Sequence, residues 1–356
     1  MNYSKRIINL QKCLMQKNMD LLILDDPISL IYLTGLKLSS GKIFILKDKA
    51  KLFVDGRYIQ AAKEKTDIDV ELIGEKVLMD FIVQNNIKNI GFDSSITTYH
   101  SFERLKSFLK KIKNAHDHSI ELIPVLSPLK ELRVIKDLDE IAVLKKAASL
   151  TWKGFEHICL HLKEGMSEKE VALEFEMFVK KNGADALSFN SIVCFGKNSA
   201  MPHHMPSDTK LKLNDIVLMD LGVTVDNYNS DMTRVVFFGK PDPTLEKIYS
   251  INKKAHANAL SVCRPGHKLK DLDIAAREVL RKEGYEKEFV HSLGHGVGLE
   301  IHEFPRVKFD TEDKDVILKP GMVITIEPGI YIPDLGGVRY EDMIVITNDG
   351  YENFYR

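Results

Sequence analysis

Cysteine is scarce in this chain, and none of the four cysteines forms a Cys-x-x-Cys pair. They are spread along the sequence at Cys13, Cys159, Cys194 and Cys263. A chain of 356 residues can bury a large core without covalent cross-links, so this pattern argues against a disulfide framework. We therefore expect reduced thiols, as in a cytoplasmic protein.

Long apolar runs and an imbalance of charge are absent as well. The apolar stretch LLIL at 21–24 is ended by Asp25, Asp26 and Pro27, and no segment is long enough to span a bilayer. The first residues show helical apolar spacing rather than the apolar centre of a signal peptide. The formal net charge of -1 gives no electrostatic reason to bind nucleic acid or a membrane surface. The sequence predicts a globular cytoplasmic protein without either partner.

The first third of the chain alternates short strands with helices, a pattern typical of an α/β domain. The predicted strands lie at 21–26, in two parts of 41–57 and at 89–93, and the predicted helices lie at 58–65, 76–86 and 99–113. Two prolines and a charged run then mark a junction within 114–140. We predict an N-terminal domain over 1–127 and a second domain over 128–356.

Two helix pairs with the same spacing are expected in the second domain. The helices of the first pair end at Gly165 and Gly183, and those of the second pair end at Gly266 and Gly284. In both pairs the two glycines are 18 residues apart. Strands that carry acidic residues follow each pair. We interpret this as a duplicated helix-helix-strand unit, in which two halves form an antiparallel sheet with helices outside and a cleft between them. The predicted fold class is α+β.

Five residues of the second domain have the chemistry of a metal site. They lie in distinctive local strings and are Asp220 (LMDLGV), Asp231 (NSDMTRVV), His295 (HSLGHGVG), Glu327 (ITIEPGIY) and Glu341 (GGVRYEDMIV). Four carboxylates and one imidazole form a hard, oxygen-rich set, which suits two divalent ions better than one structural zinc. Two such ions would balance the four negative charges, and a hydroxide between them would attack a carbonyl. The set predicts metal-dependent hydrolysis.

Hairpin patterns explain how the carboxylates could meet. Residues 215–239 have the pattern of two strands joined by a turn at 226–229, which would bring Asp220 and Asp231 side by side. The strings around Glu327 and Glu341 repeat this arrangement. Paired carboxylates in apolar surroundings repel each other, so protons or a cation must lie between them.

These strings resemble those of the pita-bread metallopeptidases, the family of methionine aminopeptidase, aminopeptidase P and prolidase. The resemblance covers 137–356, and DDPISLIYLTGL (25–36) and LFVDGRYIQAA (52–62) are similar to the N-terminal domain of creatinase, aminopeptidase P and prolidase. It implies a creatinase-like α/β domain before a pita-bread catalytic domain, two metal ions on the five residues above, and a homodimer. Methionine aminopeptidases lack the first domain and creatinase lacks the metal site, so the Xaa-Pro branch fits best.

The resemblance also implies roles for three further histidines and one arginine. His203, His291 and His302 would line the active site and bind the substrate, and His203 or His302 would stabilise the oxyanion. His204 is adjacent to His203, and only one of the two is expected to point inward; the resemblance selects His203. Arg339 would belong to the substrate site and orient a ligand carboxylate.

The expected substrates are small peptides with proline at the second position. The lead hypothesis is an Xaa-Pro aminopeptidase, similar to aminopeptidase P, in which Glu327 handles the proton of the nucleophile. The alternative is an Xaa-Pro dipeptidase (prolidase) with the same site. Arg306 could then bind the carboxylate of a dipeptide, or it could form a salt bridge within its loop. Mn²⁺ suits the ligands, with Co²⁺ and Zn²⁺ as alternatives.

Two remote alternatives come from other classes of protein. A non-catalytic binding protein on the same fold would show no metal-dependent turnover. A creatinase-like amidinohydrolase would react without metal. The complete set of five ligand residues argues against both.

Overall fold

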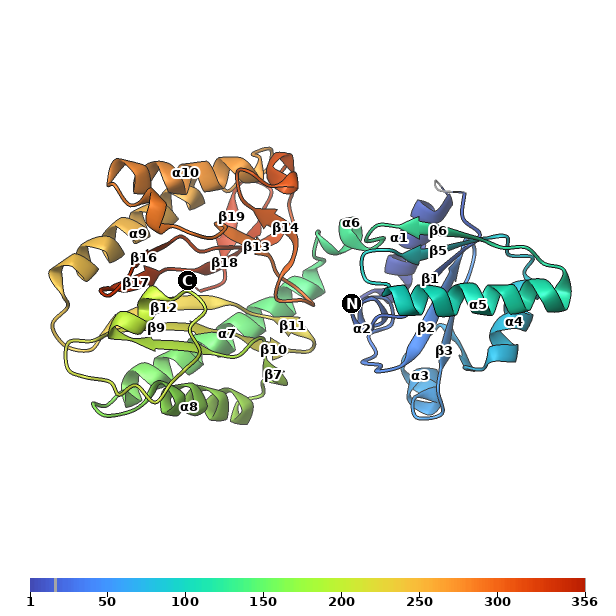
Figure 1. Ribbon diagram of the computed structural model, residues 1–356, viewed down its shortest axis with the longest axis horizontal. Coiled ribbons are helices and arrows are strands. Elements are labelled where there is room, and N and C mark those ends of the chain that lie inside the picture. The colour runs from blue at the N-terminus through green and yellow to red at the C-terminus, as the bar shows by residue number, and fades with distance from the viewer. Residues whose placement is uncertain (16–17, 356) are drawn as a thin grey trace. The chain divides into compact units, whose positions relative to one another are not determined.

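The computed structural model describes residues 1–15 and 18–355 and divides into two compact units, Met1–Arg133 and Val134–Arg356 (Figure 1). The sequence predicts a boundary between residues 127 and 128, just before the short helix α6 (Lys130–Arg133), which belongs to the first unit. None of the helices within the described residues combines the length and apolarity needed to cross a bilayer.

Three of the four cysteines have described side chains. Cys159, Cys194 and Cys263 carry free thiols. Burial raises the pKa of Cys159 to about 11, so this thiol stays protonated at neutral pH. The side chain of Cys13, like that of Met15, lies outside the described part of the chain.

A six-stranded mixed sheet forms the centre of the first unit, in the order β4-β3-β2-β1-β5-β6. Strand β1 is antiparallel to β2 and parallel to β5. All four residues of β1 are buried, as expected of a central strand that is covered on both faces. The strands are β1 (Leu21–Leu24), β2 (Gly41–Leu46), β3 (Ala50–Val54), β4 (Asp69–Leu72), β5 (Asn89–Asp93) and β6 (Glu121–Val125).

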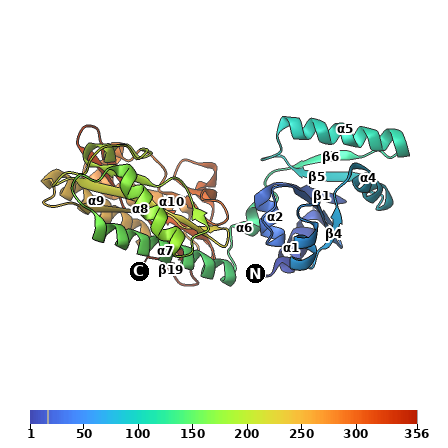
Figure 2. The ribbon, with the colours of Figure 1, turned by 90° about the horizontal axis from the view of Figure 1, so that it is seen from below.

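Helices cover both faces of this sheet, with α4 and α5 on one side and α1 and α2 on the other (Figure 2). Helix α2 begins where the sequence signals it: the Asp26 carboxylate accepts a hydrogen bond from the Ser29 N–H, and Pro27 occupies the first turn. The remaining helices of this unit are α1 (Tyr3–Met15), α2 (Pro27–Thr34), α3 (Ile59–Lys65), α4 (Glu75–Gln84) and α5 (Tyr99–His116).

Four long helices flank the strands of the second unit, α7 and α8 on one side and α9 and α10 on the other (Figure 1). Each pair packs on its own apolar cluster. Helix α8 begins with a reciprocal capping box between Ser167 and Glu170. The helices are α7 (Leu138–His161), α8 (Glu168–Lys181), α9 (Pro243–Ser261) and α10 (Leu269–Lys282).

The strand pairs described in the second unit are antiparallel, as predicted, but they are divided among four hydrogen-bonded sheets. The halves meet where the Glu341 N–H donates to the Thr233 carbonyl at 3.2 Å. The first half contains β7 (Ala186–Leu187), β8 (Ile192–Phe195), β9 (Ile216–Leu221), β10 (Val223–Val225), β11 (Tyr228–Asn229) and β12 (Met232–Phe237). The second contains β13 (Gly294–Gly296), β14 (Glu303–Val307), β15 (Val323–Ile326), β16 (Gly329–Ile332), β17 (Gly336–Arg339), β18 (Asp342–Ile346) and β19 (Tyr351–Asn353).

The two halves repeat the same backbone contacts. The Gly165 N–H donates to the Leu211 carbonyl in the first half, and the Gly266 N–H donates to the Leu318 carbonyl in the second. Both glycines have a positive φ, 81° and 90°, which favours glycine after a helix. The isolated β-bridges that follow are also equivalent: Ser167 with Lys210, and Lys268 with Ile317. The predicted duplication is confirmed.

Candidate metal centre

The hairpin of β9 and β12 supplies two of the predicted ligands. Thr233 lies opposite Asp220 in the register, and Asp231 precedes Thr233 by two residues. Because side chains alternate along strands, Asp220 and Asp231 point to the same face. At the tip, Asp226 and Asn227 adopt φ values of 48° and 71°, as a two-residue hairpin turn requires. The predicted hairpin is confirmed.

The hairpin in which β15 and β16 pair with β18 and β17 supplies two more predicted ligands, Glu327 and Glu341. Strand β15 pairs with β18 and β16 pairs with β17 in one continuous register, which sets Glu327 opposite Glu341. Both residues lie at the break between the two ladders, where Pro328 has no N–H to offer. His295 comes from β13, the strand beside β15. The repeat therefore places one carboxylate pair on each hairpin and the imidazole on one half alone.

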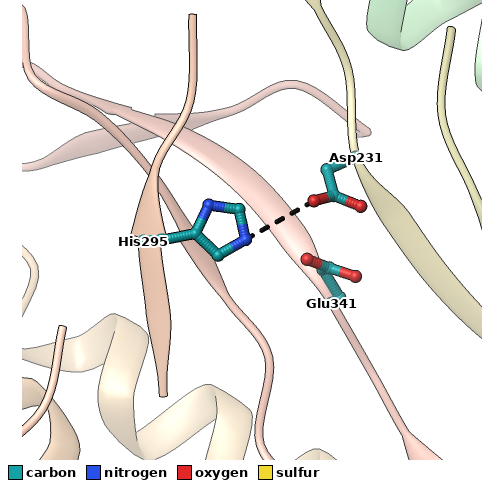
Figure 3. A group of neighbouring side chains, drawn as sticks. All are labelled: Asp231, His295 and Glu341. Carbon is teal, nitrogen blue, oxygen red and sulfur yellow. Dashed lines mark ion pairs between the residues drawn. The ribbon is translucent and has the colours of Figure 1, made fainter. Parts of the chain in front are cut away.

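The imidazole and the carboxylates converge. The Nε2 atom of His295 lies 3.5 Å from Asp231 Oδ2 and 3.4 Å from Glu327 Oε1. One ligand atom from each of Asp231, His295 and Glu341 lies within 4.8 Å of the others (Figure 3). His295 Nδ1 lies 3.0 Å from the Gly296 carbonyl, so a proton on Nδ1 is hydrogen-bonded and Nε2 keeps its lone pair toward the carboxylates.

Asp220 completes the group. Its Oδ2 atom accepts a hydrogen bond from Arg339 Nη2 at 2.6 Å. Its Oδ1 atom is buried and accepts no hydrogen bond from the described residues. A buried carboxylate oxygen without a partner is costly, and a cation at this position would satisfy it.

The charges of the site also indicate a cation. Burial raises the pKa of Glu341 to about 8, and repulsion from Asp220 adds to the shift. Burial and neighbouring carboxylates raise the pKa of Asp231 and of Glu327 well above their ordinary values. Burial lowers the pKa of His295 to about 4, so the ring is neutral, the form that binds metals. Four crowded carboxylates with a neutral imidazole fit two divalent ions.

Two threonines orient the ligand side chains. Thr233 Oγ1 donates to Glu341 Oε2 at 2.6 Å. Thr325 Oγ1 donates to Glu327 Oε1 at 3.2 Å and accepts from the His295 N–H at 3.0 Å. Neither threonine was predicted from the sequence. Each lies two residues from a ligand along extended backbone, so side-chain alternation was the signal that could have found them.

Arg339 links the two hairpins from within the core. Its side chain is 3% exposed, and besides Asp220 it donates through Nε to Thr233 Oγ1 at 2.9 Å and through Nη1 to the Tyr331 hydroxyl at 2.7 Å. The bond to Asp220 joins Arg339 to a predicted ligand carboxylate, and the orienting role stays a prediction. The described bonds go to protein atoms, and the predicted contact with substrate stays a prediction.

Replacing Arg339 with lysine is expected to weaken metal binding about 10- to 100-fold, the usual effect of disturbing a group that orients a ligand. Lysine keeps the charge, but one ammonium cannot reproduce the fork that reaches three acceptors. Titration of metal into the metal-free variant measures the affinity. The same change at the exposed Arg281, whose partner is Glu286 (2.6 Å), is the control and should leave affinity unchanged. Wild-type affinity in Arg339→Lys would contradict the orienting role.

Tyr331 connects Arg339 with His291, and no sequence pattern pointed to this tyrosine. Its hydroxyl lies 2.9 Å from His291 Nε2. Burial lowers the pKa of His291 to about 3, so the ring is neutral. His291 Nδ1 lies 2.8 Å from the Ser292 carbonyl and takes the proton, so Tyr331 donates to Nε2. Both ring nitrogens of His291 are thus engaged, and a substrate would have to displace one of these bonds.

The other two predicted histidines are exposed. The ring of His302 lies edge-on to that of His295, with 4.3 Å between centroids. Partial burial lowers the pKa of His302, and repulsion from His203 adds to the shift. The Nε2 atom of His204 lies 2.8 Å from Oε2 of the buried Glu168.

Known proteins resemble this chain over almost its whole length. Residues 142–348 match the family described as Metallopeptidase family M24, and residues 6–135 match the Creatinase/Prolidase N-terminal domain. An Xaa-Pro dipeptidase of Pyrococcus furiosus is 36% identical over 349 residues, which are 97% of this chain and 96% of that protein. The solved Xaa-Pro dipeptidase from Bacillus anthracis is 33% identical with a TM-score of 0.92, covering 100% of this chain and 98% of that one. The X-Pro aminopeptidase from Thermotoga maritima is 32% identical with a TM-score of 0.88, again covering 100% and 98%.

Proposed function

This chain belongs to metallopeptidase family M24, and from that membership we propose that it is an Xaa-Pro dipeptidase, which hydrolyses dipeptides whose second residue is proline. The predicted architecture, a creatinase-like N-terminal domain before a pita-bread catalytic domain, is confirmed by the two family matches and the solved relatives. The sequence favoured an aminopeptidase over a dipeptidase. The Pyrococcus furiosus and Bacillus anthracis relatives support the opposite order.

The position of Arg306 beside a predicted metal ligand is the observation that supports a preference for dipeptides. It lies opposite His295 in the antiparallel register of β13 and β14, so both side chains point to one face of the sheet. Arg306 is exposed, and its Nε donates to the Ser292 hydroxyl at 2.7 Å. A guanidinium beside the metal ligands can pair with a C-terminal carboxylate. A dipeptide carries that group one residue after the scissile bond, whereas a longer peptide does not.

The predicted ligands and two of the histidines have separate roles in the proposed reaction. Asp220, Asp231, His295, Glu327 and Glu341 hold two divalent ions, which when bound polarise the scissile carbonyl and lower the pKa of water. Glu327 takes up and returns a proton at its carboxylate, whose Oε1 atom lies among the ligand atoms, 3.4 Å from His295 Nε2. His203 and His302 bind the substrate and donate to the oxygen that becomes negative. The free amine of the substrate lies on the side of Asp220 and Asp231.

The metal identity, the roles of two further residues and the oligomeric state are also proposed. Family membership implies divalent metal ions, and the oxygen-rich ligands favour Mn²⁺ over Zn²⁺. His291 and Arg339, which both bond the Tyr331 hydroxyl, are proposed to belong to the substrate site. A homodimer and a cytoplasmic location stay predictions from the sequence and its resemblance.

Substrate length tests the proposal. Release of the first residue from Xaa-Pro and from Xaa-Pro-Yaa is measured after EDTA treatment and again after addition of Mn²⁺. We expect metal-restored cleavage of the dipeptide, with kcat/KM for the tripeptide lower by about 10-fold or more, the value of one charge-assisted contact. Equal or faster cleavage of the tripeptide would support the aminopeptidase alternative, to which the Thermotoga maritima enzyme is a structural guide.

The variant Arg306→Met should lose about 10- to 100-fold in kcat/KM for the dipeptide, because it removes the charge but keeps much of the length. Tripeptide cleavage, which does not use that contact, should change little. Arg264→Met provides a matched control, since Arg264 is exposed and donates to His267 rather than to the site. A uniform loss on both substrates would contradict a carboxylate-binding role for Arg306.

A further inference from the structure

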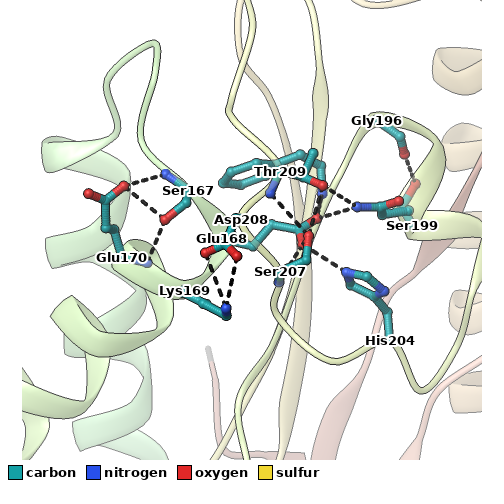
Figure 4. Close-up of polar contacts among 12 residues, drawn as sticks. Ser167, Glu168, Lys169, Glu170, Gly196, Ser199, His204, Ser207, Asp208 and Thr209 are labelled. Atoms are coloured by element: carbon teal, nitrogen blue, oxygen red, sulfur yellow. Dashed lines mark hydrogen bonds and ion pairs between the residues drawn. The ribbon is translucent and has the colours of Figure 1, made fainter.

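A buried carboxylate outside the metal centre, that of Glu168, is surrounded by hydrogen-bond donors. Glu168 opens helix α8 and is fully buried. Its Oε1 accepts from the Phe195 N–H at 2.8 Å and from Asn198 Nδ2 at 2.9 Å. Its Oε2 lies 2.8 Å from His204 Nε2 and accepts from the Ser207 N–H at 2.8 Å and from the Ser207 hydroxyl at 2.6 Å (Figure 4).

All of these donors belong to one segment, residues 195–207, which passes from β8 through a short 3₁₀ helix at 196–200. His203 lies inside this segment, next to the bound His204. Two backbone bonds close the same contact, from the Lys169 N–H to the Ser207 carbonyl and from the Glu168 N–H to the Thr209 carbonyl, both at 3.2 Å. Glu168 therefore bonds the segment before and after His203.

The same segment also rests on the strand that carries Arg339. The Gly337 N–H of β17 donates to Ser199 Oγ at 2.8 Å. A Cβ atom at Gly337 would lie 2.4 Å from the Ser199 carbonyl oxygen, so only glycine permits this approach. With β17 on one side and Glu168 on the other, the path of the segment past His203 is fixed at both ends.

The equivalent position in the other half of the duplication carries no charge. Position 168 is the first residue of α8, and the equivalent first residue of α10 is Leu269, which is also fully buried. An apolar side chain thus serves the helix in the second half. Burial alone would raise the pKa of Glu168, but the bonds from Ser207, Asn198 and His204 outweigh it and lower the pKa, so the group is a carboxylate.

We propose that Glu168 is a positioning residue that holds segment 195–207 in place and thereby sets His203 at the substrate site. The proposal rests on the function proposed above, because His203 acts on the substrate only there. Glu168 touches no metal ligand among its described contacts. Its loss should therefore spare metal binding and act on the substrate.

The test is Glu168→Gln in the full, metal-loaded protein, with Glu170→Gln as the matched control. Glutamine keeps the size but cannot accept all the donors, so we expect KM for an Xaa-Pro dipeptide to rise about tenfold with metal content unchanged. Glu170 lies in the same turn, is exposed and bonds Ser167 and Lys210 instead. Because Glu170 does not bond segment 195–207, Glu170→Gln should keep the wild-type KM.

A double-mutant cycle with His203→Ala distinguishes positioning from general destabilisation. If Glu168 acts through His203, its substitution should change KM by less than about twofold once His203 is absent. An equal effect in both backgrounds would overturn the proposal. Amide hydrogen exchange supplies a readout that needs no turnover: Glu168→Gln should speed exchange within 195–207 and Glu170→Gln should not. Unchanged exchange in Glu168→Gln would overturn the positioning role even if dipeptide hydrolysis is confirmed. Faster exchange without any dipeptide hydrolysis would instead contradict the proposed function alone.

Discussion

Replacing Asp231 with asparagine is expected to remove one of the two metal ions and to lower kcat by about a thousandfold or more, because a bound divalent ion supplies several kcal/mol of transition-state stabilisation. Asp231 is 5% exposed, and its Oδ2 lies 3.5 Å from His295 Nε2. An amide keeps the shape of the side chain but removes its negative charge. Metal analysis and dipeptide turnover measure the two effects.

The fold should survive this change. The Tyr355 hydroxyl donates to the Asp231 carbonyl at 2.7 Å, which holds the backbone whatever the side chain. The substitution also relieves repulsion among buried carboxylates, so the metal-free variant should unfold at no lower denaturant concentration than the metal-free wild type. Asp226→Asn, at the exposed tip of the same hairpin, is the control and should keep both ions and the full rate. Two bound ions and full activity in Asp231→Asn would refute the ligand assignment.

Metal-free wild-type protein is expected to lose stability as the pH rises from 6.5 to 8. Glu341 has a folded-state pKa of about 8, above its ordinary value of 4.5, so the folded state holds a proton that the unfolded state has released. Such a group contributes its full stability below pH 4.5 and loses it as the pH rises toward 8. Over 1.5 pH units the loss is about 2 kcal/mol at roughly 1.4 kcal/mol per unit, and Asp231 and Glu327 act in the same direction.

Between pH 6.5 and 8, His295 does not contribute to the pH dependence of stability. The pKa of His295 is lowered to about 4, so its contribution is lost only as the pH falls below 6.5 and is constant above it. Urea unfolding at several pH values, with and without Mn²⁺, measures the slope. The metal-loaded protein should show little slope, because its carboxylates are ionised throughout. Glu341→Gln should flatten the slope of the metal-free protein; an unchanged slope would mean that Glu341 is not the group that titrates.

Local patterns could predict how the carboxylates are grouped, whereas the full set of expected ligands came chiefly from the resemblance to the pita-bread metallopeptidases. Asp220 and Asp231 lie in one hairpin whose turn residues are visible in the sequence, and alternation then fixes their common face. Glu327 and Glu341 follow from the repeat of that pattern. Local patterns of this kind depend on neighbours within about 20 residues, which a single sequence displays.

The partners of the supporting side chains could not be predicted, because they lie far apart in the chain. The resemblance implied that Arg339 orients a ligand carboxylate, but it did not show which one. Arg339 and Asp220 are separated by 119 residues, and Glu168 and Ser207 by 39. No periodicity links such positions; only the packed halves bring them together. The dipeptide preference that we propose rests on a register of the same kind, which sets Arg306 opposite His295. From the sequence alone, carboxylate binding and a salt bridge within the loop stayed equally open for this arginine.

The two halves of the catalytic unit contribute unequally to a site that they share. Each hairpin brings two carboxylates, too few to neutralise two divalent ions. A chain of half the length would therefore need a second copy, related by a two-fold axis between the hairpins. Such a dimer must place identical residues on both sides of its substrate. A peptide has an amine end and a carboxyl end, and joining the copies in one polypeptide allows Glu168 to stand where its counterpart is Leu269 and His295 to serve one side alone. Joining the two halves in one polypeptide thus makes the site asymmetric, so that it can distinguish the amine end of a peptide substrate from its carboxyl end.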